Sequence, residues 1–150
     1  MADIKSPEKR SINMSHIRGS DTHPELVFRK WLFSYGYRYS LGNRAIPGHP
    51  DLWMPKYNAA LFVHGCFWHR HEGCKYSYMP KTRVEFWNNK FEKNVARDKR
   101  VVEELEKKGI RHLIIWECTV KKMENNAEYR NEIMDQVIQF LNSVEKYREL

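Results

Sequence analysis

Two short apolar runs constrain the fold of this 150-residue chain more than any other feature. Ala59 to Val63 and His112 to Glu117 are apolar and β-prone, which is typical of strands buried inside a sheet. Between them, apolar residues recur at helical spacing from Val84 to Lys108, and Gly109 is a stop signal. A strand, a long helix and a second strand predict an α/β fold with a mixed central sheet flanked by helices.

Flanking segments extend this prediction on both sides. Thr22 and Glu25 have the spacing of a capping box, and one apolar helical face follows them up to Gly36. Tyr37 to Ser40 and Asp51 to Met54 predict two more strands. The predicted order is therefore helix, three strands, helix, strand, helix. The last helix is marked by apolar residues at helical spacing: Ile133, Met134, Val137, Phe140, Leu141 and Val144.

The length and composition fit one globular domain, because 41% of the residues are hydrophobic and there is no spare length for a second core. Residues 1–20 are polar, mixed in charge and too poor in apolar side chains to pack by themselves. We expect them to form a flexible arm that orders on a partner. Residues 21–150 are then expected to form the single functional domain.

The chain is basic, with a formal net charge of +7. Residues 70–100 carry nine Lys or Arg and only four acidic residues, which points to a polyanionic partner. On the helix predicted there, four basic side chains recur at intervals of 3, 4 and 3 residues. Such a stripe either faces phosphates or is simply a solvated basic face, and its spacing does not choose between the two. Its members are Lys90, Lys93, Arg97 and Arg100.

No apolar run approaches the roughly 20 residues that a membrane-spanning helix needs. The first residues, MADIKSPEKRS, lack the apolar stretch of a signal peptide. We therefore expect a cytoplasmic protein with no membrane partner.

Three cysteines are an odd number, which argues against a disulfide framework and favours metal binding or plain burial. Zinc prefers four nitrogen or sulfur ligands, so a histidine would have to complete the set. Cys66 and Cys74 bracket His69 and His71 in one irregular segment, and Cys118 ends the second apolar run. The spacing closest to a zinc knuckle uses His71, but spacing alone does not decide between the two histidines. Buried free thiols remain the alternative.

Several motifs carry a family resemblance. Pro50-Asp51 before one strand, and a following strand that ends at Val63-His64, resemble the metal-binding hairpin of PD-(D/E)xK nucleases. Phe62-Val63-His64 stands where that pattern has a second carboxylate and a lysine. The string HGCFWHRHEGC, with PGHPD before it and TRVEFWNNKFEKNVARD and LIIWEC after it, closely resembles the very-short-patch-repair DNA mismatch endonucleases. The resemblance covers residues 8 to about 118 and implies a restriction-endonuclease-like fold.

The resemblance implies a set of catalytic residues. It places Mg²⁺ on the Asp51 carboxylate and on the backbone carbonyl of Val63, where other members of the family carry Thr. His69 matches the general base and His64 a second catalytic histidine, and the ordinary histidine pKa near ~6.5 suits proton transfer. Glu25 matches a carboxylate that contacts metal-bound water, a role that competes with helix capping.

The resemblance also assigns the zinc and DNA contacts. A structural Zn²⁺ is placed on Cys66, His71, Cys74 and Cys118, which leaves His69 for catalysis. Phe67 and Trp68 are expected to wedge into the base stack. Helical spacing puts Trp87 on the core-facing stripe, whereas the resemblance inserts it into DNA, and we follow the resemblance. The expected DNA-binding residues are Met14, Phe67, Trp68, Trp87, Lys90, Lys93, Asn94 and Arg97.

The expected activity is Mg²⁺-dependent nicking of double-stranded DNA 5′ of the T in T:G mismatches, as in very short patch repair. The resemblance further implies a monomer that acts at the nucleoid in the bacterial cytoplasm, with mismatch-repair proteins as candidate partners. One alternative is a zinc-containing DNA-binding module without catalysis, which would retain DNA affinity but not nick. Another is a related restriction-like nuclease with a different target.

Overall fold

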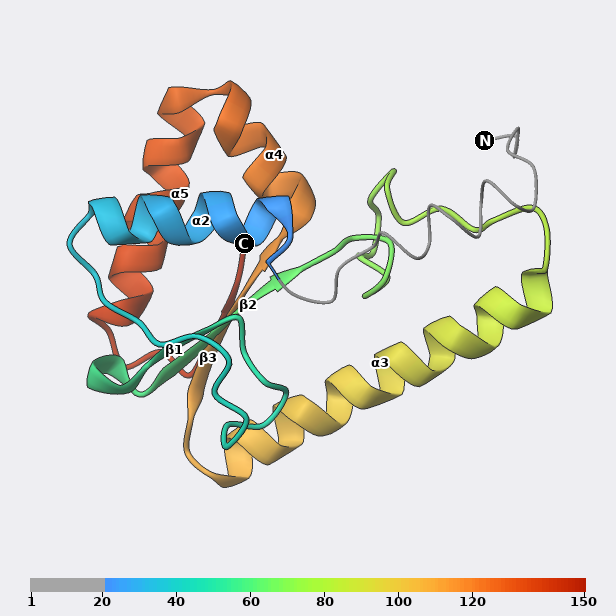
Figure 1. Ribbon diagram of the computed structural model, residues 1–150, viewed down its shortest axis with the longest axis horizontal. Coiled ribbons are helices and arrows are strands. Elements are labelled where there is room, and N and C mark those ends of the chain that lie inside the picture. Colours follow the sequence, from blue (N-terminus) through green and yellow to red (C-terminus); the bar gives the residue numbers. More distant parts are fainter. Residues whose placement is uncertain (1–20) are drawn as a thin grey trace.

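The computed structural model describes residues 21–150, which form a four-stranded mixed sheet flanked by helices (Figure 1). The strands are β1 (Leu52–Met54), β2 (Ala59–His64), β3 (Arg111–Trp116) and β4 (Tyr147–Glu149), and they lie side by side in this order. β1 is antiparallel to β2, whereas β2, β3 and β4 are mutually parallel. The helices are α2 (His23–Ser34), α3 (Val84–Lys107), α4 (Glu117–Asn125) and α5 (Ala127–Leu141), and a 3-10 turn, η1, spans Pro55–Tyr57.

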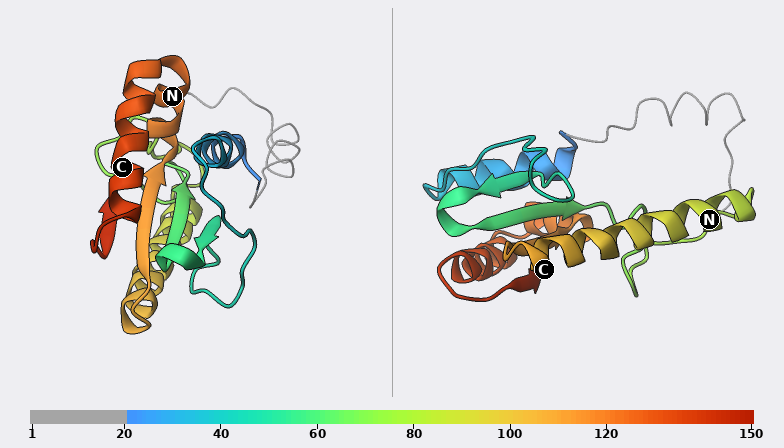
Figure 2. Two further views of the ribbon diagram at one scale, coloured as in Figure 1. Left: turned by 90° about the vertical axis from the view of Figure 1, so that its left-hand side faces the viewer. Right: turned by 90° about the horizontal axis from the view of Figure 1, so that it is seen from below.

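The helices cover both faces of the sheet. α2, α4 and α5 lie on one face, and the long helix α3 lies on the other and extends beyond the end of the sheet (Figure 1). Figure 2 shows the same arrangement from two further sides. Because side chains alternate along a strand, Leu61 packs toward α2 and α5 whereas Phe62 packs with Leu105 of α3. The predicted α/β class, with a mixed sheet between helices, is therefore confirmed.

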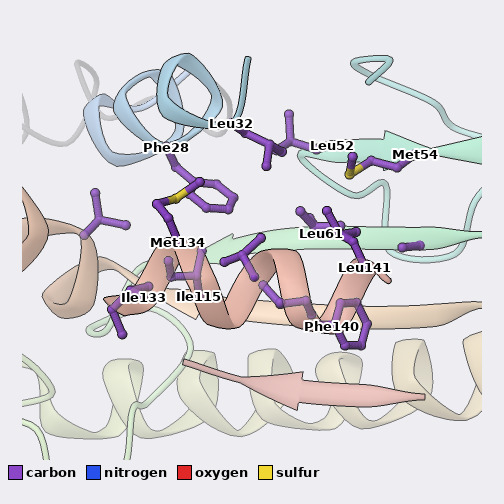
Figure 3. Close-up of a cluster of buried hydrophobic side chains, with 14 of the residues drawn as sticks. Phe28, Leu32, Leu52, Met54, Leu61, Ile115, Ile133, Met134, Phe140 and Leu141 are labelled. Carbon is purple, nitrogen blue, oxygen red and sulfur yellow. The ribbon is translucent and has the colours of Figure 1, made fainter. Parts of the chain in front are cut away.

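The main hydrophobic core lies between the sheet and the layer of α2, α4 and α5 (Figure 3). Phe28, Leu61, Ile115 and Phe140 meet there and are completely buried. Burying one such side chain contributes about 1.5–3 kcal/mol. This packing holds β2 and β3 in place, and the carboxyl end of β2 is where the candidate site begins.

One strand prediction is wrong, and one strand of the sheet was missed. Tyr37 to Ser40 is not a strand, because only Ser40 pairs, through an isolated bridge to Trp53. The partner strand β1 has just three residues and offers little edge for further pairing. In addition, β4 was not predicted at all, although it extends the sheet beside β3.

The helix boundaries also differ from the prediction in part. Cys118 lies in the first turn of α4, a helix that was not predicted, rather than at a strand end. Val144 is 93% exposed because α5 already ends at Leu141. The long helix was predicted to within a residue, as α3 runs from Val84 to Lys107.

The predicted capping box at the start of α2 does not form. The Thr22 side chain makes no capping hydrogen bond, and Glu25 Oε2 instead accepts the backbone N–H of Asp21 at 2.9 Å. The predicted stop at Gly36 is present, since this residue has φ +91°, a conformation that glycine adopts without strain.

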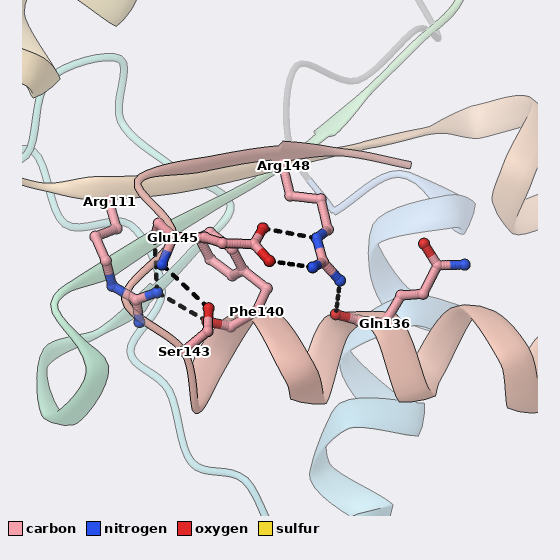
Figure 4. A network of polar contacts seen from close by, with 6 residues as sticks. All are labelled: Arg111, Gln136, Phe140, Ser143, Glu145 and Arg148. Carbon is pink, nitrogen blue, oxygen red and sulfur yellow. Dashed lines mark hydrogen bonds and ion pairs between the residues drawn. The ribbon is translucent and has the colours of Figure 1, made fainter.

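Two arginines join the later elements (Figure 4). The Arg111 guanidinium, on β3, donates to the backbone carbonyls of Phe140 at 2.8 Å and Glu145 at 3.0 Å. Arg148, on β4, pairs with the Glu145 carboxylate and donates to the carbonyl of Gln136 at 2.8 Å. These side-chain contacts fasten the short strand β4 to α5.

Among residues 21–150, no helix is both long and apolar enough to cross a membrane.

Candidate active site and metal centre

The candidate site surrounds the carboxyl end of β2 and the irregular segment, residues 65–83, that follows it. This segment runs beside the amino-terminal half of α3 (Figure 1). Two contacts hold the two together: the Asn94 side chain donates to the carbonyl of Trp68 at 3.1 Å, and the rings of Phe67 and Phe91 meet edge to face at 5.1 Å. The segment therefore rests on a rigid helix although it has little regular structure of its own.

Two carboxyl groups meet beside the penultimate residue of β2. Asp51 immediately precedes β1, and its Oδ2 accepts the backbone N–H of Val63 at 2.6 Å across the antiparallel pair. Glu25 comes from the first turn of α2 and is 6% exposed. Burial, reinforced by the Glu25 carboxylate, raises the pKa of Asp51 to about 7, although the hydrogen bond from Val63 opposes the shift. A bound cation would relieve this repulsion.

Two histidines meet one residue further along. His64 ends β2 and His69 lies in the following segment, and their rings stack with centroids 3.8 Å apart and planes within 5° of parallel. His69 Nδ1 lies 2.8 Å from a carboxylate oxygen of Asp98 on α3. The resemblance brought no role for Asp98. Asn94 lies one helical turn before Asp98 and contacts the preceding residue, Trp68, but both contacts join residues far apart in the chain, so no local pattern in the sequence reveals them.

The expectation of an ordinary pKa is wrong for His64. Burial, together with the neighbouring His69, lowers the pKa of His64 to about 3. At neutral pH this ring is therefore uncharged, and it can offer a lone pair or an N–H group but not a spare proton.

A second constellation gathers all three cysteines and one histidine. One ligand atom each from Cys66, His71, Cys74 and Cys118 lies within 4.8 Å of the others. The backbone N–H of Cys118 points to Cys66 Sγ at 3.4 Å, and Cys118 Sγ lies 3.5 Å from His71 Nδ1. His69 contacts Asp98 instead. The fold therefore groups His71, and not His69, with the three cysteines, a choice that the spacing in the sequence did not make.

The chemistry of this group fits a zinc ion. Four sulfur or nitrogen donors are the usual set of a closed structural site. Burial raises the pKa of the Cys66 thiol to about 12 and that of Cys118 as well. Buried thiolates are thus costly without a cation, and a divalent metal would offset that cost.

Several known proteins are similar in sequence to this chain. The chain is 42% identical to the type II nicking enzyme V.XorIIP of Xanthomonas oryzae, over 82% of this chain and 90% of that enzyme. It is 37% identical to the type II nicking enzyme V.NmeAIP of Neisseria meningitidis, over 91% of this chain and 97% of that enzyme. It is 40% identical to the DNA mismatch endonuclease Vsr of Escherichia coli, over 83% and 79% of the two chains. A family model described as DNA mismatch endonuclease Vsr matches residues 2–75.

The chain belongs to the Vsr family of DNA mismatch endonucleases. The resemblance inferred from the sequence is thereby confirmed, as is the restriction-endonuclease-like fold class. A member of the Vsr family is a DNA endonuclease, and its partner is DNA.

An aromatic cluster covers one side of the site in this Vsr-family protein. The Phe67 ring meets Trp68 at 5.1 Å and Trp87 at 5.4 Å between centroids, and Trp68 and Trp87 lie 5.9 Å apart. All three side chains are half-buried. Trp87 thus lies with the two expected wedge residues and outside the buried core, to which α3 contributes Phe91 and Leu105. Val95, another of the apolar residues at helical spacing in α3, is 38% exposed.

The basic residues predicted on α3 line an exposed stripe beside this cluster. Lys90, Lys93, Arg97 and Arg100 are all exposed, and Lys90 Nζ lies 5.8 Å from the ring centroid of Trp68. Asn94 is half-buried because its side chain supports Trp68. Met14, the remaining expected DNA contact, lies outside the described residues.

Proposed function

We propose that this Vsr-family chain nicks double-stranded DNA 5′ of the T in a T:G mismatch and leaves a 5′-phosphate, by Mg²⁺-dependent phosphodiester hydrolysis. One observation carries the proposal: two kinds of catalytic group converge on consecutive residues of one strand. Val63 holds the Asp51 carboxylate, and His64 stacks on His69. A site for a metal-held phosphate and a base for the attacking water therefore lie side by side.

Asp51 and the backbone carbonyl of Val63 are the groups that would hold Mg²⁺. The raised pKa of Asp51 beside Glu25 fits this role, because the positive charge of Arg29 offsets the effect of burial and of the Glu25 carboxylate only in part. The bound ion supplies charge that neutralises the phosphate and polarises its oxygens. A carbonyl ligand does not depend on the side chain, so Val in place of the family's Thr preserves it.

His69 is the proposed general base. Asp98 accepts the Nδ1–H of His69, which leaves the lone pair on Nε2 to take a proton from the attacking water. His64, neutral in its buried position, keeps the His69 ring in place by stacking and offers hydrogen bonds to the reacting groups. Glu25 would orient water at the metal.

Zn²⁺ on Cys66, His71, Cys74 and Cys118 is the proposed structural clamp of the segment. The clamp brackets Phe67 and Trp68, so these rings are held rigidly beside the catalytic histidine. Unstacking bases costs a few kcal/mol per step and less at a mismatch, which gives a rigid wedge a means of selecting T:G over T:A. Trp87 of α3, whose ring contacts both Phe67 and Trp68, inserts into the DNA together with them.

The remaining parts of the proposal concern the rest of the chain. We propose that residues 21–150 are the endonuclease domain and that the arm of residues 1–20, with Met14, orders on DNA. Lys90, Lys93, Asn94 and Arg97 contact the DNA from α3. The enzyme acts as a monomer, and mismatch-repair proteins are its candidate partners.

Nicking of end-labelled duplexes tests the proposal directly. With Mg²⁺ present, a T:G duplex should be nicked 5′ of the T and a matched T:A duplex should not. Asp51→Ala should abolish nicking, whereas Asp135→Ala, at an exposed position of α5, should not affect it. Equal cutting of T:G and T:A would contradict the mismatch specificity. Retained DNA affinity without any Mg²⁺-dependent nicking would favour a DNA-binding module.

A further inference from the structure

His64, His69 and Asp98 form a second group of metal-ligand side chains, separate from the cysteine cluster. One ligand atom from each lies within 4.8 Å of the other two. They come from three different elements: the end of β2, the segment after it, and α3. The His69 and Asp98 side chains are 23% and 28% exposed, so solvent ions reach them.

The donor set has a definite preference among metal ions. Two imidazoles and one carboxylate suit Zn²⁺, Co²⁺ and other first-row transition metals, whereas Mg²⁺ prefers an all-oxygen shell. Three protein ligands also leave a fourth position for water, as in open zinc sites.

The geometry needs a modest adjustment to hold an ion. Ligand atoms around a tetrahedral zinc lie about 3–4 Å apart, as bonds of roughly 2.0–2.2 Å require. The ligand atoms lie within 4.8 Å of one another, with His69 Nδ1 already 2.8 Å from Asp98, and the stacked rings must tilt so that both lone pairs converge. Rotation about the last torsion of a histidine is soft, and His69 lies in an irregular segment that accommodates it.

We propose that His64, His69 and Asp98 bind a transition-metal ion such as Zn²⁺ or Co²⁺ and that its binding blocks nicking. The block follows because an ion held between His69 and Asp98 occupies Nδ1 of His69. The ring proton then lies on Nε2, so His69 has no lone pair left to accept the proton of the attacking water. The inhibition rests on the proposed function, whereas the binding does not.

Metal binding is tested without DNA. Protein carrying one Zn²⁺ per chain at the cysteine cluster, verified by mass spectrometry, is titrated with Co²⁺ and followed by visible absorption and calorimetry. We expect one further Co²⁺ per chain, with d–d bands but without the thiolate charge-transfer bands that cysteine ligands produce. Absence of this Co²⁺, or bands showing thiolate ligands, would overturn the proposal.

Variants locate the site. His64→Gln and Asp98→Asn should each weaken the binding of this Co²⁺ by at least about tenfold, since each removes one of three ligands. His23→Gln is the matched control, because His23 also pairs with a carboxylate, that of Glu124 at 3.0 Å, but outside any such group among residues 21–150. Circular dichroism and zinc content verify that each variant is folded. Asp98→Asn lies on the surface of a long helix and is expected to perturb folding less than His64→Gln. Unchanged Co²⁺ affinity in both ligand variants would overturn the assignment.

Activity provides the second readout. Zn²⁺ added to a Mg²⁺-supported T:G nicking reaction should inhibit it, and raising Mg²⁺ about tenfold should not restore the rate, because the two ions occupy different ligands. Rescue by Mg²⁺ would place the inhibiting zinc on Asp51 and contradict the proposal. Co²⁺ binding at the histidines in a protein that never nicks DNA would refute the proposed function alone.

Discussion

The contact between Asp98 and His69 determines which nitrogen of the ring can accept a proton. Asp98→Asn weakens the orientation of His69 and the stabilisation of its positive form, so we expect nicking to slow by about 10²-fold. DNA affinity should stay about the same, because Asp98 contacts His69 and is not one of the proposed DNA contacts. Single-turnover nicking and DNA titration measure the two effects, with Asp135→Asn as the control. A full nicking rate in Asp98→Asn would exclude the His69–Asp98 pair from the mechanism.

His112 on β3 is buried, and within residues 21–150 neither of its ring nitrogens has a hydrogen-bond partner. Burial lowers its pKa in the folded protein, with Glu106 opposing, and the Tyr147 ring packs on it at 4.6 Å. The unfolded chain, whose histidines titrate near ~6.5, therefore binds the proton first, so stability is complete above that pH and falls below it.

His112→Phe removes this particular acid sensitivity. The variant should be at least as stable as the wild type at about pH 8, because two unpaired nitrogens are replaced by apolar atoms. The difference in the free energy of unfolding between the variant and the wild type should grow toward about pH 5, because only the wild type loses stability through protonation of His112 in its unfolded state. Urea unfolding at both pH values measures the free energies. An advantage that does not change with pH would mean that His112 does not titrate as inferred.

The basic stripe of α3, beside the aromatic cluster, is exposed to solvent along its whole length, from Lys90 to Arg100. If Lys93 neutralises one phosphate, Lys93→Gln should weaken DNA binding and reduce the slope of log affinity against log salt by about 1. Lys107→Gln, in the last turn of the same helix, should leave the slope unchanged. Binding isotherms at several salt concentrations distinguish the cases. Equal slopes for both variants would identify the stripe as a merely solvated face.

The segment of residues 65–83 has few backbone hydrogen bonds of its own and depends on its contacts with α3 and on the proposed zinc clamp. Cys74→Ser should lose zinc, as measured by mass spectrometry, and expose this segment to limited proteolysis. The sheet and its helices should stay protected, because Phe28, Leu61 and Phe140 pack without the segment. Ser77→Ala, in the same segment but outside the cysteine cluster, is the control. Undiminished zinc content in Cys74→Ser would contradict the ligand set.

The three-layer architecture makes stability depend on the core between the sheet and α2, α4 and α5. Phe140→Ala should destabilise the protein by about 3–5 kcal/mol, because a completely buried ring leaves a cavity. Val144→Ala should have little effect, since this residue is 93% exposed although it continues the same apolar pattern. Chemical unfolding curves of the two variants measure the contrast. A similar cost for both would mean that the helix extends further than its observed end at Leu141.

Local patterns in the sequence were enough to predict the elements that depend on near neighbours. The apolar run of β2 and the helical spacing of α3 determined those elements almost to the residue, because burial and periodicity are written into adjacent positions. The pairing of β4 with β3 and the lack of pairing for Tyr37 to Ser40 depend on residues far apart in the chain, so no local pattern revealed them.

The candidate site divides in the same way. The residue types and the family strings identified the nuclease family and named the cysteines and histidines, because those features are linear. Three-dimensional packing determined which histidine joins the cysteines, brought Asp98 to His69, and lowered the pKa of His64. Each of these depends on distances between separate elements and on exclusion of water. Such properties arise only when β2, the segment after it and α3 come together.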